Sequence, residues 1–128
     1  MQTELQIGDV VTGMYKTGKY IGEITDIRPR HYLVRILAVL KHPQQGDLHN
    51  PQQADVPLFH ERKALAYREQ TNMLKQQVKP YEEEVPPYDQ SLRQALDEQL
   101  AKLKTEETLW AERSITNLKE LEKEYFSS

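Results

Sequence analysis

The sequence of 128 residues has a net charge of −3 and contains no cysteine. This length fits one small domain, or one domain with an appendage, and a chain without cysteine has no disulfide, thiolate metal site or cysteine lipidation. The longest purely apolar run, residues 36–40, is far below the roughly 20 residues that span a bilayer. Because the N-terminus also lacks the features of a signal peptide, we expect a cytoplasmic protein with no direct membrane insertion.

Charge is unevenly distributed along the chain. Residues 1–81 carry a net charge of +3, and residues 82–128 carry −6. Halves of this kind indicate a mildly basic body and an acidic arm. A nucleic-acid-binding protein is expected to concentrate basic side chains on one face, so we predict no nucleic-acid partner.

The first 81 residues have the pattern of short strands joined by tight turns. The predicted strands are 10–15, 20–27, 31–41 and 62–71, with a short fifth strand ending near 81 after a helical turn at 74–77. The third is apolar enough to be buried on both faces, and the fourth competes with a helix because alanine and arginine favour helices. Five such strands predict a small antiparallel SH3-like β-barrel over residues 1–81.

A long connection, residues 42–61, interrupts the predicted barrel. Connections of this length without periodicity are usually functional or disordered. This one contains Leu48, Val56, Leu58 and Phe59, which are too apolar for a mere linker. We therefore expect an ordered loop folded onto the strands.

Residues 82–90 form the predicted linker, with three glutamates followed by Pro86 and Pro87, which exclude helix there. Residues 91–126 form the predicted helical arm, since apolar side chains recur every 3.6 residues and Ser91 with Gln94 fits a capping box. The stripe is weakest at residues 105–107, so one helix and two helices both remain open. The expected class is α+β, with a barrel followed by an extended helical region.

Signals for catalysis are weak. Residues 13–19 match the spacing of a phosphate-binding loop, but Tyr20 follows where Ser or Thr is needed, and a strand follows where the motif requires a helix. No nucleophile elbow or Gly-rich nucleotide fingerprint occurs, and none of the four histidines lies on the predicted helices. We therefore expect no enzyme, no catalytic residue, no phosphotransfer chemistry and no cofactor.

The loop keeps an alternative open, namely a small metal- or ligand-binding protein, or an enzyme, that uses residues 42–62. Its candidate metal ligands are His42, Asp47, His49 and His60, since imidazole and carboxylate suit divalent ions. No known metal-binding loop has this spacing, so histidines that cap turns are the expected outcome. Residues 60–62 could similarly form a polar site or a hydrogen-bonded cluster that fixes the loop.

A resemblance to a known family extends over nearly the whole chain. It is carried by GDVVTG (8–13), YKTGKYIGE (15–23), HYLVR (31–35), KHP (41–43), QGDLH (45–49), FHER (59–62), ALAYREQTN (64–72) and VKPY (78–81). Together these segments resemble kinase-associated protein B of endospore-forming Gram-positive bacteria. The match is dense to residue 88 and looser in the helical tail.

The resemblance implies a barrel-like sheet with a helical extension, and a role as activator of a membrane sensor histidine kinase that feeds the sporulation phosphorelay. The family has been described as a lipoprotein, from which this cysteine-free chain departs, so membrane proximity would have to come through the kinase. The resemblance brings no catalytic residues with it.

We predict that the helical arm and the loop make the contact with the partner. The predicted contact residues are Leu58, Phe59, His60, Glu61, Arg62, Leu100, Leu103, Trp110, Leu118 and Leu121. Aromatic anchors such as Trp110 often dominate interface energies, and an exposed apolar stripe rarely stays uncovered. The stripe could serve a kinase or a homo-oligomer; alternatively, it packs inside the chain, against the barrel or within a helical hairpin.

Overall fold

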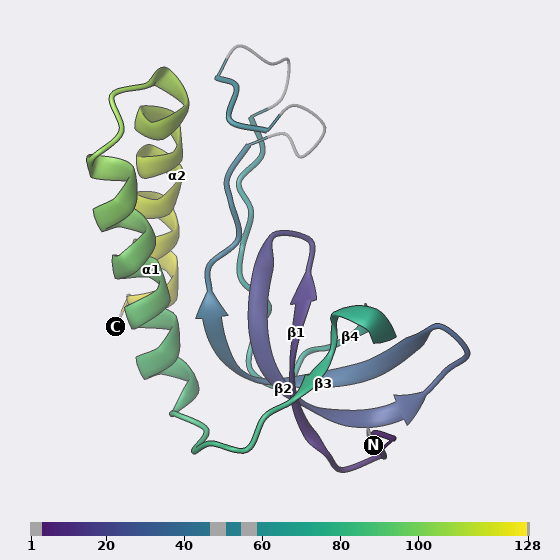
Figure 1. Ribbon diagram of the computed structural model, residues 1–128. Helices are drawn as coiled ribbons and strands as arrows, with labels where there is room; N and C mark the ends of the chain where they lie inside the picture. Colours follow the sequence, from purple (N-terminus) through teal and green to yellow (C-terminus); the bar gives the residue numbers. More distant parts are fainter. Residues whose placement is uncertain (1–3, 47–50, 55–58, 128) are drawn as a thin grey trace.

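The computed structural model describes residues 4–46, 51–54 and 59–127 (Figure 1). Its elements are β1 (Val10–Tyr15), β2 (Gly18–Ile27), β3 (His31–Lys41), β4 (Gln70–Leu74), the 3₁₀ turn η1 (Lys75–Gln77), β5 (Lys79–Pro80), α1 (Tyr88–Lys104) and α2 (Leu109–Phe126). One antiparallel sheet is thus followed by two helices. The predicted α+β class is confirmed.

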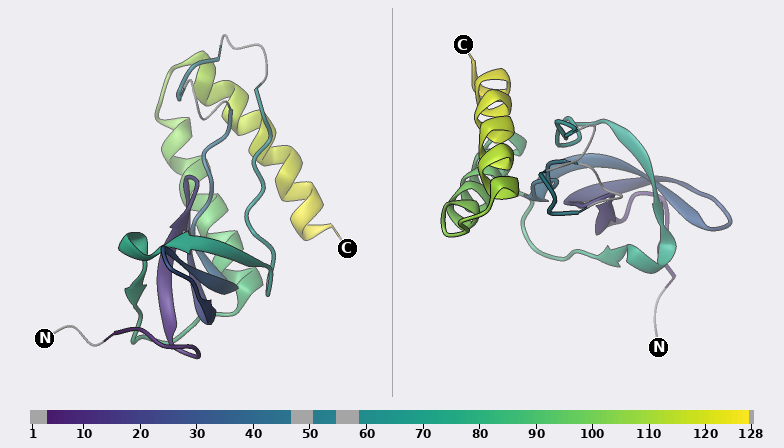
Figure 2. Two further views of the ribbon diagram at one scale, coloured as in Figure 1. Left: turned by 90° about the vertical axis from the view of Figure 1, so that its right-hand side faces the viewer. Right: turned by 90° about the horizontal axis from the view of Figure 1, so that it is seen from above.

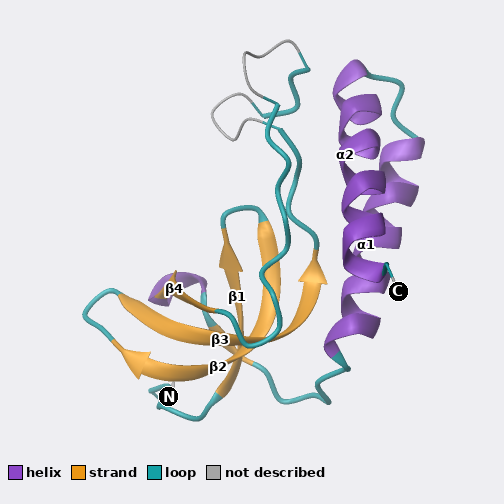
Figure 3. Ribbon diagram, turned by 180° about the vertical axis from the view of Figure 1, so that it is seen from behind, coloured by secondary structure: helices purple, strands orange, loops and turns teal. Residues whose placement is uncertain are grey.

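The five strands lie in the order β4-β3-β2-β1-β5, and every neighbouring pair is antiparallel. Figure 3 shows the long strands β2 and β3 curving across the sheet. Within the described residues no ladder joins β4 to β5, so the sheet is not closed and the predicted barrel is a loose one. A hairpin turn at Lys16 and Thr17 joins β1 to β2, in agreement with our rejection of the phosphate-binding loop.

Gly22 allows β2 and β3 to approach each other closely. The register of this pair shifts between Ile21 and Gly22. A Cβ atom at Gly22 would lie 2.6 Å from the carbonyl oxygen of Arg35 and would also overlap Val34. Glycine within a strand commonly marks such a close approach, and the bulge bends the strand.

The prediction of a strand over residues 62–71 is wrong, because β4 begins only at Gln70. The preceding backbone N–H groups are bonded to side chains. Arg62 N donates to Gln45 Oε1, Ala64 N to Tyr125 Oη, and Leu65 N to Tyr20 Oη. Since each residue has only one backbone donor, these amides are not available for a strand ladder.

The strand β3 is fully buried on one face only. Along that face Tyr32, Val34, Ile36 and Ala38 are at most 7% exposed. On the other face Val39 is 2% exposed, but Leu33 and Leu37 are only half-buried. Burial on both faces was therefore an overestimate, because α1 covers only part of the sheet (Figure 2).

The helical region is a hairpin of two helices, which settles the question of one helix or two (Figures 1 and 2). It breaks at the predicted weak point, and Thr108 caps α2 by accepting a hydrogen bond from Ala111 N at 3.0 Å. This cap satisfies one of the free N–H groups at the helix start. Neither helix is both long and apolar enough to cross a bilayer, among the residues described.

Helix α1 begins earlier than predicted, at Tyr88, with Pro87 as its N-cap. The predicted capping box is therefore wrong. Ser91 is buried inside the helix, and its Oγ accepts a hydrogen bond from Val39 N of β3 at 2.9 Å. The last three residues of the predicted linker 82–90 are therefore helical. The division of the chain into domains stays a prediction.

The apolar stripe of the helices is buried inside the chain. Its members Leu100, Leu103, Trp110, Leu118 and Leu121 are at most 7% exposed and form one cluster with Leu96 and Ala111. Our premise that these five side chains offer exposed apolar area to a partner is corrected. The alternative of an intrachain hairpin describes the structure, because each helix covers the apolar face of the other.

Replacement of Trp110 by alanine should lower the free energy of unfolding by about 3–5 kcal/mol, the usual cost of removing a buried aromatic ring. Urea denaturation of the purified protein measures this loss. The matched control is Leu109→Ala, one residue earlier on α2, where the side chain is 69% exposed and the loss should be small. Equal losses in the two variants would contradict the burial of Trp110.

Candidate functional site

The side chain of Gln45 joins the two arms of the long loop, because it bonds to the backbone of Arg62 as a neighbouring strand would. Gln45 donates from Nε2 to the carbonyl of Arg62 and accepts from Arg62 N through Oε1, both at 2.9 Å. Next to it, Arg62 Nε donates to the Gly46 carbonyl, and Gly46 N donates to the His60 carbonyl. Residues 60–62 thus form a hydrogen-bonded cluster that joins the loop to itself.

The described parts of the loop lie against the helical hairpin (Figure 3) and also touch the turn between β1 and β2, where Gln44 N donates to Thr17 Oγ1 at 2.8 Å, so our prediction of a loop folded onto the strands holds only in part. Trp110 Nε1 donates to the Gln45 carbonyl at 3.3 Å. Arg113 donates to the Ala54 carbonyl, and its guanidinium lies 4.4 Å from the centre of the Phe59 ring. Cation–π contacts of this kind are modestly stabilising, so α2 holds the described parts of both arms.

A buried histidine joins the sheet, the loop and α2. His42, directly after β3, is 0% exposed; its Nδ1 lies 3.0 Å from the Pro43 carbonyl oxygen, and its Nε2 lies 3.0 Å from Tyr125 Oη. Because a carbonyl only accepts, Nδ1 carries the proton, and in the neutral ring Nε2 then accepts from the hydroxyl. Tyr125 Oη in turn accepts from Ala64 N at 2.9 Å. This arrangement fits a neutral imidazole.

Burial affects both ionisable groups of this pair. Burial lowers the pKa of His42 from its ordinary value of 6.5, because a charged imidazole would lose its hydration. Burial likewise raises the pKa of Tyr125 to about 12. The hydroxyl therefore stays protonated at neutral pH and can donate to the neutral histidine.

Helix α1 joins the same cluster through Gln99. The Pro43 carbonyl accepts from Gln45 Nε2 at 3.1 Å and from Gln99 Nε2 at 3.2 Å, in addition to His42. The Oε1 atom of Gln99 is buried without a hydrogen-bond partner among the described residues. One carbonyl thus collects donors from the end of β3, from the loop and from α1. We call these residues, with Tyr125, the His42 cluster.

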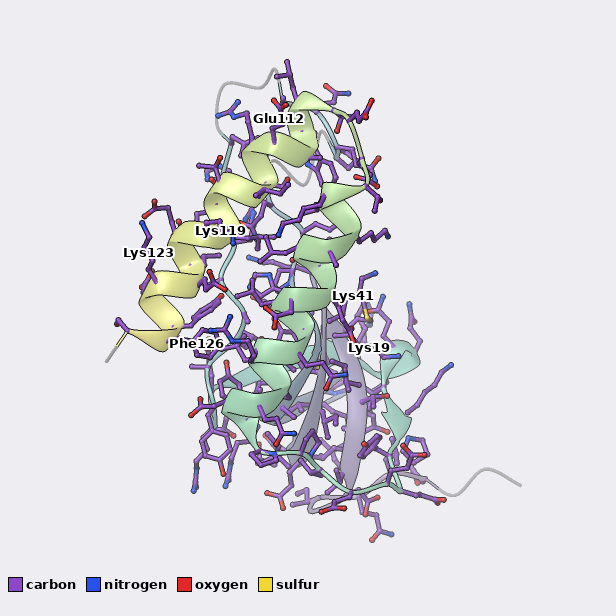
Figure 4. All side chains as sticks on the ribbon, turned by 90° about the vertical axis from the view of Figure 1, so that its left-hand side faces the viewer. Lys19, Lys41, Glu112, Lys119, Lys123 and Phe126 are labelled. Atoms are coloured by element: carbon purple, nitrogen blue, oxygen red, sulfur yellow. The ribbon has the colours of Figure 1, made fainter. Side chains whose placement is uncertain are left out.

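A groove of about 410 Å³ lies beside the His42 cluster, between the sheet, the loop and α1. It is lined by apolar Leu40, Ala95, Leu103 and Trp110, by polar His42, Gln44, Gln52 and Gln99, and by charged Lys19, Lys41, Glu98, Lys102 and Glu106. Its volume falls within the roughly 300–1,000 Å³ typical of ligand pockets. Figure 4 shows Lys19 and Lys41 side by side next to α1.

The predicted site residues do not come together as one surface. Of the nine predicted partner contacts that the structure describes, only Leu103 and Trp110 line the groove. His60 and Glu61 are exposed and Phe59 is half-buried, whereas Leu58 lies outside the described residues.

The candidate metal ligands Asp47 and His49 also lie outside the described residues. Both ring nitrogens of His42 are already bonded within the protein. No group of three or more carboxylates or histidines is placed for a metal ion in the part of the chain that the structure describes.

Sequence reasoning missed Gln45, Gln99 and Tyr125 as site residues. Gln45 falls in a segment that carries the family resemblance, but nothing in the sequence indicates that any of these three side chains is bonded in the interior. Except for the bond from Gln45 to Pro43, their partners lie 17 to 83 residues away in the sequence. A buried polar tip on a tyrosine requires a hydrogen-bond partner, but the sequence does not say which one.

Three comparisons with known proteins agree with one another. The family model "Kinase associated protein B" matches residues 15–126. The protein named kinase-associated lipoprotein B of Bacillus subtilis (strain 168) is 62% identical over 122 residues, with 95% of each chain covered. The crystal structure of kinase-associated protein B from Bacillus cereus superimposes with a TM-score of 0.81 at 47% identity, covering 95% of this chain and 98% of that chain.

Acidification should destabilise the fold through His42. The pKa of His42 is lowered in the folded state, so the unfolded chain binds more protons, and stability falls as the pH drops below about 6.5. Urea denaturation at pH 7.5 and pH 5.5 should show this loss in the wild type. In His42→Gln, which cannot titrate, the loss should be smaller.

The matched control is His31→Gln, at the half-buried start of β3, which should keep the pH dependence of the wild type. An unchanged pH dependence in His42→Gln would exclude His42 as its source.

Tyr125→Phe removes one hydroxyl and should lower the free energy of unfolding by about 1–3 kcal/mol, because two buried groups, His42 Nε2 and Ala64 N–H, then have no partner. Thermal unfolding measures the loss. Tyr67→Phe is the control, since its ring is 54% exposed. Faster amide exchange at Ala64 should accompany the loss, and normal exchange there would contradict the bond.

Proposed function

The chain belongs to the kinase-associated protein B family, and on that premise we propose that it binds and activates a membrane sensor histidine kinase that feeds the sporulation phosphorelay. The single observation that supports this proposal is the 62% identity to the Bacillus subtilis protein over 95% of both chains. That protein is named as kinase-associated. Activation and the sporulation pathway are the parts that the proposal adds.

We propose that the protein acts as a regulatory binding module without chemistry of its own. The helices carry no histidine, so neither can serve as a phosphoacceptor helix of the kind found in kinases. His42 is buried with both nitrogens bonded, which makes it a poor phosphoacceptor. These observations favour a contact that changes the kinase over a transfer of phosphate.

Among the predicted contact residues that the structure describes, those of the loop are still accessible to a partner. His60 and Glu61 present exposed side chains, while backbone bonds to Gln45 and Gly46 fix the segment that carries them. A surface held in one conformation loses little entropy when a partner binds. The buried stripe residues act indirectly, because they hold the helices against this loop.

Membrane proximity in this proposal comes through the kinase. The Bacillus subtilis relative is named a lipoprotein, but the present sequence has no cysteine to carry an S-linked lipid. We therefore place the protein in the cytoplasm, bound to the cytoplasmic part of the kinase.

Addition of the protein to the cytoplasmic part of the cognate kinase with radiolabelled ATP should raise the rate of autophosphorylation about fivefold or more, a common size of allosteric coupling. The protein itself should stay unlabelled. A sensor kinase of another pathway is the control and should not respond. An unchanged rate at saturating protein would refute activation, and acid-labile phosphate on this chain would refute the absence of chemistry.

A further inference from the structure

Two lysines face each other at the mouth of the groove. Lys19 of β2 and Lys41 of β3 are direct cross-strand partners, and both side chains are exposed. Like charges directly opposite each other on neighbouring strands are destabilising. Neither lysine forms an ion pair with a carboxylate of the described residues. No ion pair within the described residues therefore offsets the repulsion between the two lysines.

The opposite wall of the groove carries a third lysine in a different setting. Lys102 lies on α1 with Glu98 one turn before it, and Glu106 follows in the connection after the end of the helix. Side chains four residues apart on a helix are neighbours, so Glu98 partly offsets the charge of Lys102. The groove consequently has a cationic end at the sheet, with Lys19 and Lys41, whereas the opposite wall carries one lysine and two glutamates.

Apolar surface lies between these two walls. Leu40, which directly precedes Lys41 in β3, is 36% exposed. Leu40 and Lys41 both line the groove, together with the buried side chains of Leu103 and Trp110. An exposed apolar floor with charges at the rim is the arrangement of many protein interfaces, where an apolar centre is surrounded by polar groups. Such a floor suits an apolar side chain, and the rim suits its charged neighbours.

We propose that this groove is the docking site for an acidic, amphipathic segment of the partner kinase. An apolar side chain of that segment packs on Leu40, and an adjacent carboxylate lies between Lys19 and Lys41. Charge complementarity selects this occupant, because a carboxylate at that position removes the repulsion between the two lysines. The inference rests on the function proposed above and adds the place and chemistry of the contact.

The His42 cluster explains why such a groove is already shaped before binding. His42 and Gln99 line the groove and are both bonded to the Pro43 carbonyl. These bonds hold the end of β3 at a fixed position relative to α1. A preformed groove reduces the ordering cost of binding.

Charge reversal tests the cationic end. Titration of the cytoplasmic part of the cognate kinase with the Lys19→Glu/Lys41→Glu protein should give at least tenfold weaker binding than the wild type, and the wild-type affinity should fall with added salt. The control is Lys119→Glu/Lys123→Glu, which makes the same charge change on α2, away from Lys19 and Lys41 (Figure 4). It should bind within twofold of the wild type.

Leu40→Gln tests the apolar floor in the same titration. Leu74→Gln is a close control, since Leu74 of β4 is 38% exposed against 36% for Leu40 and does not line the groove. Binding should weaken about tenfold for Leu40→Gln and should not change for Leu74→Gln. Unfolding curves of all variants confirm that each is folded at the assay temperature.

The outcomes separate this inference from the proposed function. If Lys19→Glu/Lys41→Glu and Leu40→Gln bind the kinase as tightly as the wild type, the groove is not the docking site, while the proposed kinase role stands. A wild type that neither binds nor activates the kinase would overturn both proposals.

Two further measurements exclude other occupants. Self-association in sedimentation that is lost on charge reversal would assign the groove to a second copy of the chain and overturn a kinase segment as its occupant. Saturable binding of dodecanoate at micromolar concentration, without competition from the kinase, would overturn the kinase segment as occupant in favour of a small amphiphile.

Discussion

The hydrogen bonds of the His42 cluster hold the separate parts of this structure together. They join the end of β3 to both arms of the loop and to both helices, through the Pro43 carbonyl and Tyr125 Oη. In an interior of low dielectric constant, a fully paired polar network is rigid, and a partly paired one is costly. The position of the helical hairpin beside the sheet, and with it the groove, depends on this cluster staying paired.

Local signals in the sequence predicted the sheet and the helices well. The turn at Lys16 and Thr17, the apolar strand β3 and the 3.6-residue periodicity each depend on residues that are close in sequence. The fourth strand was misplaced because distant Gln45, Tyr125 and Tyr20 accept hydrogen bonds from the backbone N–H groups of residues 62, 64 and 65. Periodicity also shows that a helix has an apolar face but not what covers it, so a partner surface and a hairpin interior looked alike.

The candidate site could be predicted only in part, and the reason is again distance. The histidines drew attention to the right segment, but His42 follows the exposed Lys41, and nothing nearby indicates that it is buried. The groove takes its lining from residues between Lys19 and Trp110, which no local pattern connects. The repulsion between Lys19 and Lys41 becomes visible only when the register of β2 and β3 is known.

The separation of His42 from Tyr125 sets an order of events during synthesis. The two residues lie 83 positions apart, and at about 5–20 residues per second a ribosome needs roughly 4–17 s to make that stretch. Strands β1 to β3 can pair in that interval, whereas the imidazole has no hydroxyl to accept from. Contacts between distant residues form late because closing a long loop is costly in entropy. A nascent chain thus has its sheet before its groove, so a translation product interrupted within α2 would lack the bond that holds the groove in its final shape.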